Sequence, residues 1–332
     1  MCEHNAECQH TIRRNWPAAQ QDGEGGALVD DVTELHSSGV PDHHILTAGF
    51  PCQSFTQLCD SRAGVQAHRT GWDERTGSLV WHVMRIAAER RPDAMILENV
   101  RGLLTIDQGA TLRTIVAGLR AIGYEVEYRL LNSSSLLAQH RARLYFVCVR
   151  ADLLARLRPG AAAVAPSGAD GEAGGFGFPW PVLPELNRRV KHILEPESAV
   201  PARHTLEPHR WSKVSSSAYF AKFPEARLVD PEGVAQTVGS SYKRGWQLYT
   251  QFVPPATHSG SSRDLPRFFT PREVARLQGF PEKFDLNIDN DAVNENGTST
   301  ALDEGRSYHQ LGNAVSPPVR FGPLLIPLCL SF

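Results

Sequence analysis

The sequence of 332 residues has no excess of basic charge and no long apolar run. Lys and Arg number 34 against 36 Asp and Glu, giving a net charge of −2, so any phosphate contacts must come from local patches. No run approaches the roughly 18 apolar residues of a membrane span, and residues 1–5 lack the basic and apolar regions of a signal peptide. We therefore expect an intracellular protein, nuclear if eukaryotic or cytoplasmic if bacterial, with no membrane partner.

The six cysteines, at positions 2, 8, 52, 59, 148 and 329, form no CxxC pair. This spacing argues against structural zinc and against a disulfide framework, so we expect no metal and a reducing compartment. Hydrophobic residues make up 41% of the chain and charged residues 21%, as in a globular protein with a substantial core. The length is sufficient for one large domain and a smaller one.

Short apolar runs alternate with helical spacing in the first 150 residues. Residues 44–48, 94–97, 125–130 and 144–149 are predicted strands. Helical spacing predicts helices over about 77–90 and 112–122, the second closed by Gly123. This order predicts an α/β fold with an open, mostly parallel sheet and helices on both faces.

The pattern changes after residue 150. Residues 151–175 are rich in Ala, Gly and Pro and predict a linker, and the region to about 262 has no clear period. Order returns at Thr270, Pro271 and Glu273, which predict a helix start, with Gly279 at its end. We therefore expect a first domain over 1–150, a second, smaller domain over 151–262, and a C-terminal segment, 263–332, that returns to the first domain.

Two side chains capable of chemistry follow predicted strands. Cys52 comes just after the strand that ends at Ala48, with Pro51 fixing the backbone approach, and Glu98 directly follows the strand 94–97. If these strands are parallel neighbours, the thiol and the carboxyl group emerge at the same edge of the sheet. A thiolate beside a proton-handling group can serve in nucleophilic catalysis. Alone, each residue would be an ordinary loop residue.

Five segments in order resemble motifs of the cytosine-5 DNA methyltransferase family. They are GFPCQSF (49–55), ENV (98–100), QHRAR (139–143), the run from 267 to 281, and QLGNAV (310–315). Each pattern is weak alone, but five in order are specific. The resemblance implies a Rossmann-like S-adenosylmethionine-dependent methyltransferase sheet over 1–150 and a target-recognition region over 151–262. It also implies a monomer that acts on double-stranded DNA.

The same resemblance implies roles for individual side chains. Cys52 would attack carbon 6 of a flipped-out cytosine and so make carbon 5 reactive. Glu98, kept partly protonated by burial, would donate to ring nitrogen 3 and hold the exocyclic amine. Arg143 would contact the base oxygen at position 2, and Arg141 would help to hold the adjoining nucleotide backbone. Residues 60–76 would close over the base.

The implied methyl donor is S-adenosylmethionine. By resemblance, Glu3 would bind its ribose and Asp31 its adenine, while Asn313 would approach its methionine end. Pro51 and Val315 belong to the same implied cofactor site.

The chain departs from the family at its start, because no Asp-x-Phe-x-Gly-x-Gly strand and turn precedes Glu3. The missing strand would lie between the strands leading to Glu3 and to Cys52. An incomplete gene model is the favoured explanation, since the catalytic residues are all present. The alternatives are a split enzyme completed by a complementary N-terminal fragment, and a decayed paralogue. Two other functions stay open: a tRNA cytosine-5 methyltransferase, and an inactive or split nucleic-acid-binding half-enzyme.

Overall fold

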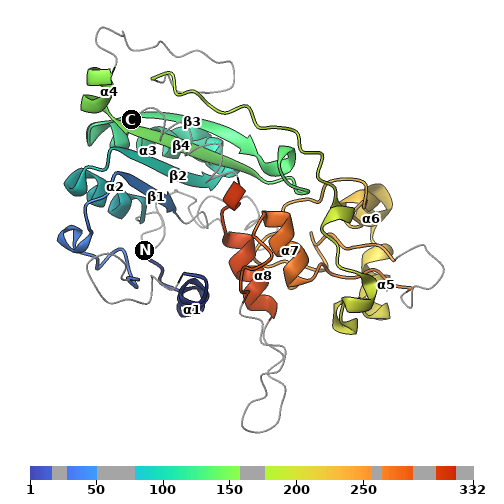
Figure 1. Cartoon of the computed structure of the whole chain (residues 1–332). Helices are drawn as coiled ribbons and strands as arrows, with labels where there is room; N and C mark the ends of the chain where they lie inside the picture. The colour runs from blue at the N-terminus through green and yellow to red at the C-terminus, as the bar shows by residue number, and fades with distance from the viewer. Residues whose placement is uncertain (17–27, 51–78, 158–175, 256–263, 287–303, 319–332) are drawn as a thin grey trace, which may run out of the picture.

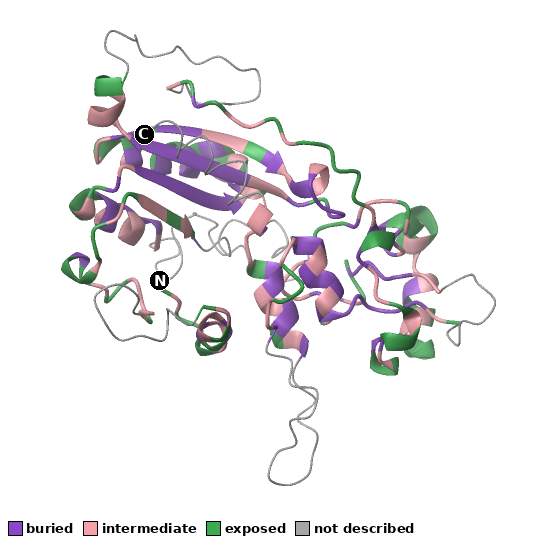
Figure 2. Ribbon diagram, viewed as in Figure 1, coloured by how far each residue is buried: buried purple, intermediate pink, exposed green. Residues whose placement is uncertain are grey.

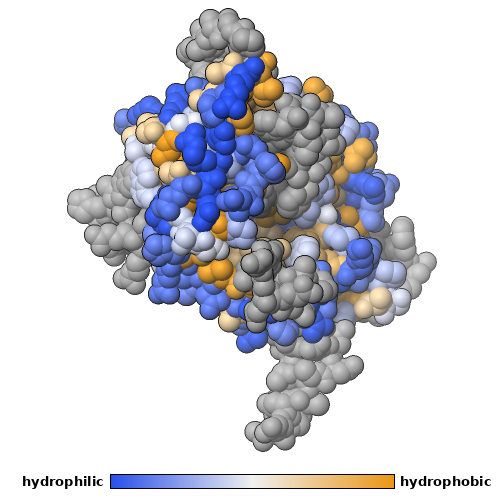
Figure 3. Space-filling model, turned by 60° about the vertical axis from the view of Figure 1, so that its left-hand side comes forward, coloured by the Kyte–Doolittle hydropathy of each residue, from blue (hydrophilic) through white to orange (hydrophobic). Residues whose placement is uncertain are grey.

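The computed structural model describes residues 1–16, 28–50, 79–157, 176–255, 264–286 and 304–318 (Figure 1). A four-stranded sheet occupies one side, and helices α7 (Pro271–Gln278) and α8 (Glu304–Asn313) lie between it and helices α5 (Pro208–Ser215) and α6 (Ala218–Lys222). Within these segments, no helix is both long enough and apolar enough to cross a membrane. The face shown in Figure 3 is mainly hydrophilic, with small separate hydrophobic patches.

The sheet has the strand order β1 (Ile45–Gly49), β2 (Ala94–Val100), β4 (Ala142–Arg150) and β3 (Tyr124–Asn132). All four predicted strands are confirmed. β1 is parallel to β2, whereas β4 is antiparallel to both β2 and β3. Three of the four described strands, β1, β2 and β3, therefore run in the same direction as expected, and β4 alone is antiparallel. Residues 133–141 between β3 and β4 are too few for a parallel crossover, which takes a dozen or more.

Strand β2 is longer than predicted, which changes the setting of Glu98. Pairing between β2 and β4 continues as far as Val100, which lies opposite Arg143. Glu98 therefore lies within the strand, between Gly49 of β1 and Tyr145 of β4, and not in a loop after it. Hydrogen bonding on both edges holds its backbone in place, so the carboxyl group projects from a fixed position.

Helices α2 (Leu79–Arg90) and α3 (Ala110–Ala121) confirm the two predicted helices, but both pack into the same apolar cluster with the sheet. The strands β1, β2 and β3 run in the same direction and progress one way across the sheet. Right-handed crossovers between them must therefore place both helices on the same face. Among the described residues, the other face is covered largely by residues 176–183, and Leu154 of α4 (Ala151–Leu157) is the helical contribution to that cover.

β1 differs from its neighbour in burial. The first six residues of β2 are all buried, whereas Thr47 and Gly49 of β1 are exposed (Figure 2). β1 is an edge strand of the described sheet although its sequence is largely apolar. A separate parallel bridge joins Cys2 to Val29, and Glu3 N donates to Val29 O at 2.9 Å. Among the described residues, no strand pairing links this bridge to β1.

A second apolar core lies beside the sheet. Its members come from residues 190–286 and from α8, together with Ala138, and they include Leu206, Phe252, Phe269, Leu277 and Tyr308. This core therefore crosses the domain boundary expected near residue 262. The chain returns to the sheet at Val315, which packs against the apolar cluster on the face of the sheet away from α2 and α3.

The segment around Phe178 packs on the sheet and not in the second core. Phe178 N and Trp180 Nε1 donate to the two carboxylate oxygens of Glu127 in β3, at 2.8 and 3.0 Å. Trp180 also lies under the guanidinium of Arg129, 5.3 Å from the ring centroid. These contacts make residues 176–183 a strap across the first domain.

The remaining described elements are short. Helix α1 (Ala6–Asn15) follows Glu3, and the side chain of Asn5 caps its N-terminus. The 3-10 turns are η2 (Ser37–Gly39), η5 (Arg101–Leu104), η6 (Ile106–Gly109), η7 (Ser133–Ser135), η8 (Val190–His192), η9 (Glu197–Ala199), η10 (Ala202–His204) and η11 (Pro224–Ala226). Four of them, η8 to η11, lie at turns in the second core, which accounts for the absence of a readable period there.

Candidate active site

The ends of β1 and β2 meet Val315 at one point. A Cβ placed on Gly49 would lie 3.3 Å from Glu98 Oε2 and 3.6 Å from Val315 Cγ2, so three separate segments converge within van der Waals reach. Cys52 and Pro51 follow Gly49 closely in sequence and lie outside the described residues. The structure thus brings the chain that leads to Cys52 directly beside Glu98.

Asn99 helps to hold Phe50, the last described residue before Pro51 and Cys52. Its Nδ2 donates to Phe50 O at 3.4 Å, and its own Oδ1 accepts from Val100 N at 2.8 Å. Phe50 is buried and packs near Phe146 of β4, with ring centroids 6.4 Å apart. The backbone is therefore anchored two residues before the cysteine, by a residue for which no role was expected.

Glu98 and Arg143 form an ion pair. Arg143 Nε lies 3.1 Å from Glu98 Oε1, and the side chain of Arg143 is only 15% exposed and that of Glu98 only 12%. The partial protonation expected for Glu98 stays a prediction. In the pair, the carboxyl group accepts from Arg143 Nε, and Glu98 must carry a proton to donate a hydrogen bond to a base nitrogen.

Arg141 is placed differently from its expected contact with the nucleotide backbone. The residue is 2% exposed, and its Nη2 donates to Gly312 O at 2.9 Å and to Ala314 O at 2.6 Å. A guanidinium enclosed by protein carbonyls has no open face for a phosphate. In this arrangement, Arg141 supports the chain before Val315.

Two of the expected cofactor residues, Glu3 and Asp31, lie on neighbouring segments. Glu3 follows the Cys2–Val29 bridge on one side and Asp31 follows it on the other, and His4 Nδ1 lies 4.0 Å from Asp31 Oδ2. A backbone hydrogen bond from Thr33 is the main cause of a lowered pKa of Asp31. Carboxylates beside the Cys2–Val29 bridge can accept hydrogen bonds from hydroxyl and amino groups, so Glu3 and Asp31 fit a nucleoside-containing ligand.

Helix α1 connects these carboxylates to α8, which carries Asn313. Thr11 Oγ1 donates to Gln310 Oε1 at 3.0 Å, and Arg306 Nε lies 2.9 Å from Glu7 Oε1. Asn313 at the end of α8 is exposed, with its Nδ2 3.3 Å from His309 Nε2. These two contacts hold α1, the helix that follows Glu3, against α8, the helix that precedes Val315.

Two buried glutamines were missed as functional positions. Gln139 is fully buried, and its side chain bridges Val238 N at 2.8 Å and Leu277 O at 3.1 Å. Gln278, also fully buried, donates to Leu311 O at 2.9 Å and accepts from Ser316 Oγ at 3.0 Å. Their occurrence inside the resembling motifs was a usable signal, but the partners come from distant segments.

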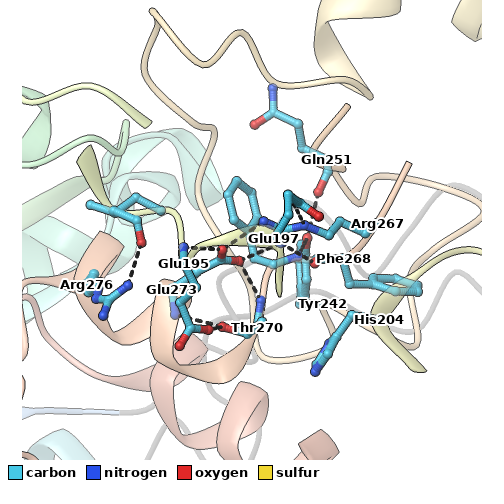
Figure 4. Close-up of polar contacts among 12 residues, drawn as sticks. Glu195, Glu197, His204, Tyr242, Gln251, Arg267, Phe268, Thr270, Glu273 and Arg276 are labelled. Atoms are coloured by element: carbon cyan, nitrogen blue, oxygen red, sulfur yellow. Dashed lines mark hydrogen bonds and ion pairs between the residues drawn. The ribbon is translucent and has the colours of Figure 1, made fainter. Parts of the chain in front are cut away.

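A buried polar cluster fixes the start of α7 (Figure 4). Arg267 pairs with Glu273 through two bonds, Nη1 to Oε2 at 2.8 Å and Nη2 to Oε1 at 2.9 Å, and its Nε lies 3.0 Å from Glu197 Oε1. Thr270 is the N-cap that was predicted, and it forms a reciprocal cap with Glu273. Gly279 ends the helix with φ 84°, and a Cβ there would lie 2.6 Å from Pro318.

Metal binding finds no support among the described side chains, since they contain no group of three or more His, Cys, Asp or Glu suited to an ion.

Comparisons with known proteins agree with the fold and with the family that the sequence motifs resemble. The model of the family described as C-5 cytosine-specific DNA methylase matches residues 2–322. Type II methyltransferase M1.ScrFI of Lactococcus lactis subsp. cremoris is 31% identical over 280 residues, covering 82% of this chain and 62% of that protein. Type II methyltransferase M.NlaX of Neisseria lactamica is 28% identical over 309 residues, covering 90% and 80%. The solved Entamoeba histolytica methyltransferase EhMeth shares the fold, with a TM-score of 0.63 and 15% identity over 99% of this chain and 88% of that one.

Proposed function

Since the chain belongs to the C-5 cytosine-specific DNA methylase family, we propose that it methylates carbon 5 of cytosine in double-stranded DNA. The observation that carries the proposal is the convergence of Gly49, Glu98 and Val315, with Arg143 paired to Glu98. This convergence supports the proposal because the carboxyl group of Glu98 and the guanidinium of Arg143 lie beside the segment that leads to Cys52. The chain spans 62% of the length of M1.ScrFI, so the activity of the whole protein is part of this proposal.

Carbon 5 of cytosine is a poor nucleophile, which makes a covalent route necessary. The Cys52 thiolate adds to carbon 6, its electron pair forming the sulfur–carbon bond while the ring becomes an enamine. Glu98, once protonated, donates to ring nitrogen 3 and accepts from the exocyclic amine. Arg143 donates to the oxygen at position 2. After alkylation, a base removes the proton from carbon 5, and the thiolate leaves as the ring double bond re-forms.

The base must leave the duplex before this chemistry, at a cost of a few kcal/mol. We propose that residues 151–262 provide the DNA-recognition surface, on a unit whose core includes α7 and α8. Glu98 and Arg143 pair with each other, and the base would separate them and replace that contact.

S-adenosylmethionine, the proposed cofactor, supplies an electrophilic methyl group when bound. Glu3 and Asp31 would hold its ribose and adenine, and Asn313, Val315 and Pro51 would line the methionine side. The Cys2–Val29 bridge and the docking of α1 on α8 support this grouping. We further propose that a segment pairing with β1 completes the cofactor site, supplied in the same chain or as a complementary fragment, because β1 is a half-exposed edge of the described sheet.

Methyl transfer from labelled cofactor to duplex DNA and to tRNA tests the function. We expect labelling of duplex DNA, loss of labelling in Cys52→Ser, and normal labelling in the control Cys8→Ser. Activity on tRNA alone would disprove the DNA assignment. If a completing strand is required, calorimetry will detect cofactor binding only after that strand is supplied.

Duplex DNA with fluorine at carbon 5 of the target cytosine tests the covalent route. Fluorine cannot leave as the proton does, so the adduct between Cys52 and carbon 6 should persist through denaturing electrophoresis. A variant lacking the thiol should form no such band.

We also propose a monomer in a reducing intracellular compartment. The support is that the described cysteines Cys2, Cys8 and Cys148 are all free thiols. Light scattering of the purified protein, with and without DNA, checks the monomer.

A further inference from the structure

Three segments far apart in sequence meet around Arg141. Residues 138–140 pair with the stretch at 235, through Ala235 N to Ala138 O at 2.9 Å and His140 N to Ala235 O at 2.7 Å. Arg141 then reaches the third segment, donating to Gly312 O and Ala314 O at 2.9 and 2.6 Å. Its Nη1 also donates to Val238 O at 3.4 Å. A single buried guanidinium therefore joins the second core to the turn after α8.

Gly312 provides a direct backbone contact at this junction. A Cβ on Gly312 would lie 2.2 Å from Ser240 N and 2.4 Å from Gly239 C, so neither backbone could stay in place with a larger residue. Gly239 itself is different, since a Cβ there would meet nothing within 4 Å. The close approach thus depends on the absence of a side chain at one position only.

The junction is continuous with the candidate active site. Val315 follows the carbonyls that Arg141 holds, and it lies against Gly49 beside Glu98. On the other side, Arg143 is two residues from Arg141 and pairs with Glu98. A shift of Val238 or Gly312 would therefore displace both Val315 and Arg143, which lie on two sides of Glu98.

We propose that Arg141 and Gly312 are positioning residues that couple the placement of the segment 235–240 to the geometry of the Glu98 site. This proposal rests on the proposed function and deepens it: recognition by the second unit sets the reactive arrangement through this junction. Arg141 acts through protein carbonyls and makes no contact with DNA. Arginine suits this role because its planar guanidinium holds five donors in a rigid fork, whereas the ammonium of lysine carries three donors at the end of a flexible stem.

The salt dependence of DNA binding separates positioning from a phosphate contact. Removing one phosphate contact reduces the slope of log Kd against log salt concentration by about 1. We expect Arg141→Gln to leave that slope unchanged and to lower kcat at least tenfold. Arg141→Lys should not restore kcat, because it keeps the charge but loses the fork. A reduced slope in Arg141→Gln that Arg141→Lys restores would overturn the proposal.

A second glycine outside the junction provides a control for the backbone contact. Gly312→Ala should lower kcat at least tenfold, and Gly39→Ala should leave it within about twofold of the parent, because a Cβ on Gly39 would meet only Leu35 Cδ1, at 3.9 Å. Equal losses in both variants would count against a specific role of Gly312. If Gly312→Ala does not fold, the arginine variants still decide the matter.

Hydrogen exchange tests the coupling without DNA or activity. In Arg141→Gln, peptides covering 235–240 and 311–316 should both exchange faster, while those of α3 keep the parent rate. Loss of protection in only one of the two segments would show that Arg141 does not couple them. If the parent fails to methylate DNA, the proposed function has failed, and this exchange result still judges the junction by itself.

Discussion

Arg143 Nε lies 3.1 Å from Glu98 Oε1, linking β4 to β2 at the end of the described sheet. The pair keeps a buried carboxylate and a guanidinium facing the segment that leads to Cys52. Both groups are therefore oriented before any base arrives, which lowers the cost of organising the site during the reaction.

Replacing Glu98 tests the proton-handling role. Glu98→Gln keeps the size and can still hydrogen-bond, but it cannot transfer a proton, so we expect kcat to fall by about 10²–10⁴. The Kd for duplex DNA should change little, because the carboxyl group is not part of a phosphate contact. Single-turnover rates and fluorescence anisotropy measure the two quantities, and an unchanged rate would contradict the role.

Arg143→Lys tests the geometry of the pair. Lysine retains the positive charge but lacks the planar arrangement of donors. We therefore expect kcat/KM of Arg143→Lys to fall below that of the parent and to be no higher than that of Arg143→Gln. The control is Arg129→Lys on β3, whose guanidinium lies over Trp180 and outside the site. Full activity of Arg143→Lys would mean that charge alone is sufficient.

The buried pair of Arg267 and Glu273 should contribute strongly to stability. Both side chains are at most 2% exposed, and Glu273→Gln leaves a buried cation with one partner fewer, so we expect a loss of about 3–5 kcal/mol. Glu282→Gln is the matched control, because its pair with Arg276 is at the surface and should contribute about 0–1 kcal/mol. Urea unfolding measures both, and equal effects would refute the difference in burial as the cause.

Glu304 should make stability depend on acid. Burial by itself would raise its pKa, but hydrogen bonds from His204, Lys243 and Arg203 hold the pKa well below its ordinary value. The folded state therefore prefers the carboxylate, and its contribution is complete above the unfolded pKa of about 4.5 and declines as the pH falls below it.

The measurement compares the parent with Glu304→Gln. The difference in unfolding free energy should be about 1–3 kcal/mol near pH 7 and should shrink between about pH 5 and pH 3. Glu232→Gln, which removes an exposed partner of Lys191, should show almost no such difference. Parallel curves for the parent and Glu304→Gln would contradict the prediction.

Thiol reactivity should follow burial. Burial raises the pKa of Cys148 in β4 far above its ordinary value, and burial with nearby Glu3 and Glu7 raises the pKa of Cys8 to about 11. Only the thiolate is alkylated, so at pH 8 iodoacetamide should leave Cys148 unmodified in the folded protein and modify Cys8 slowly. Peptide mass spectrometry checks this, with the urea-unfolded protein as the control in which both react.

The local elements and the order of motifs could be predicted from sequence because they depend on neighbouring residues. Apolar spacing indicated the four strands and the helices α2 and α3. Thr270, Pro271, Glu273 and Gly279 together indicated both ends of α7. The resembling motifs selected Glu98 and Arg143, which the structure brings together.

Only the tertiary structure decided what these elements contact. β4 inserts antiparallel beside β2, which extends that strand through Glu98 and makes the sheet mixed. Arg141 faces protein carbonyls and not an open surface, because the segments at 238 and 312 close around it. Sequence spacing carries helical and strand periodicity, whereas these contacts join residues more than 40 positions apart, and their geometry depends on how the whole chain packs.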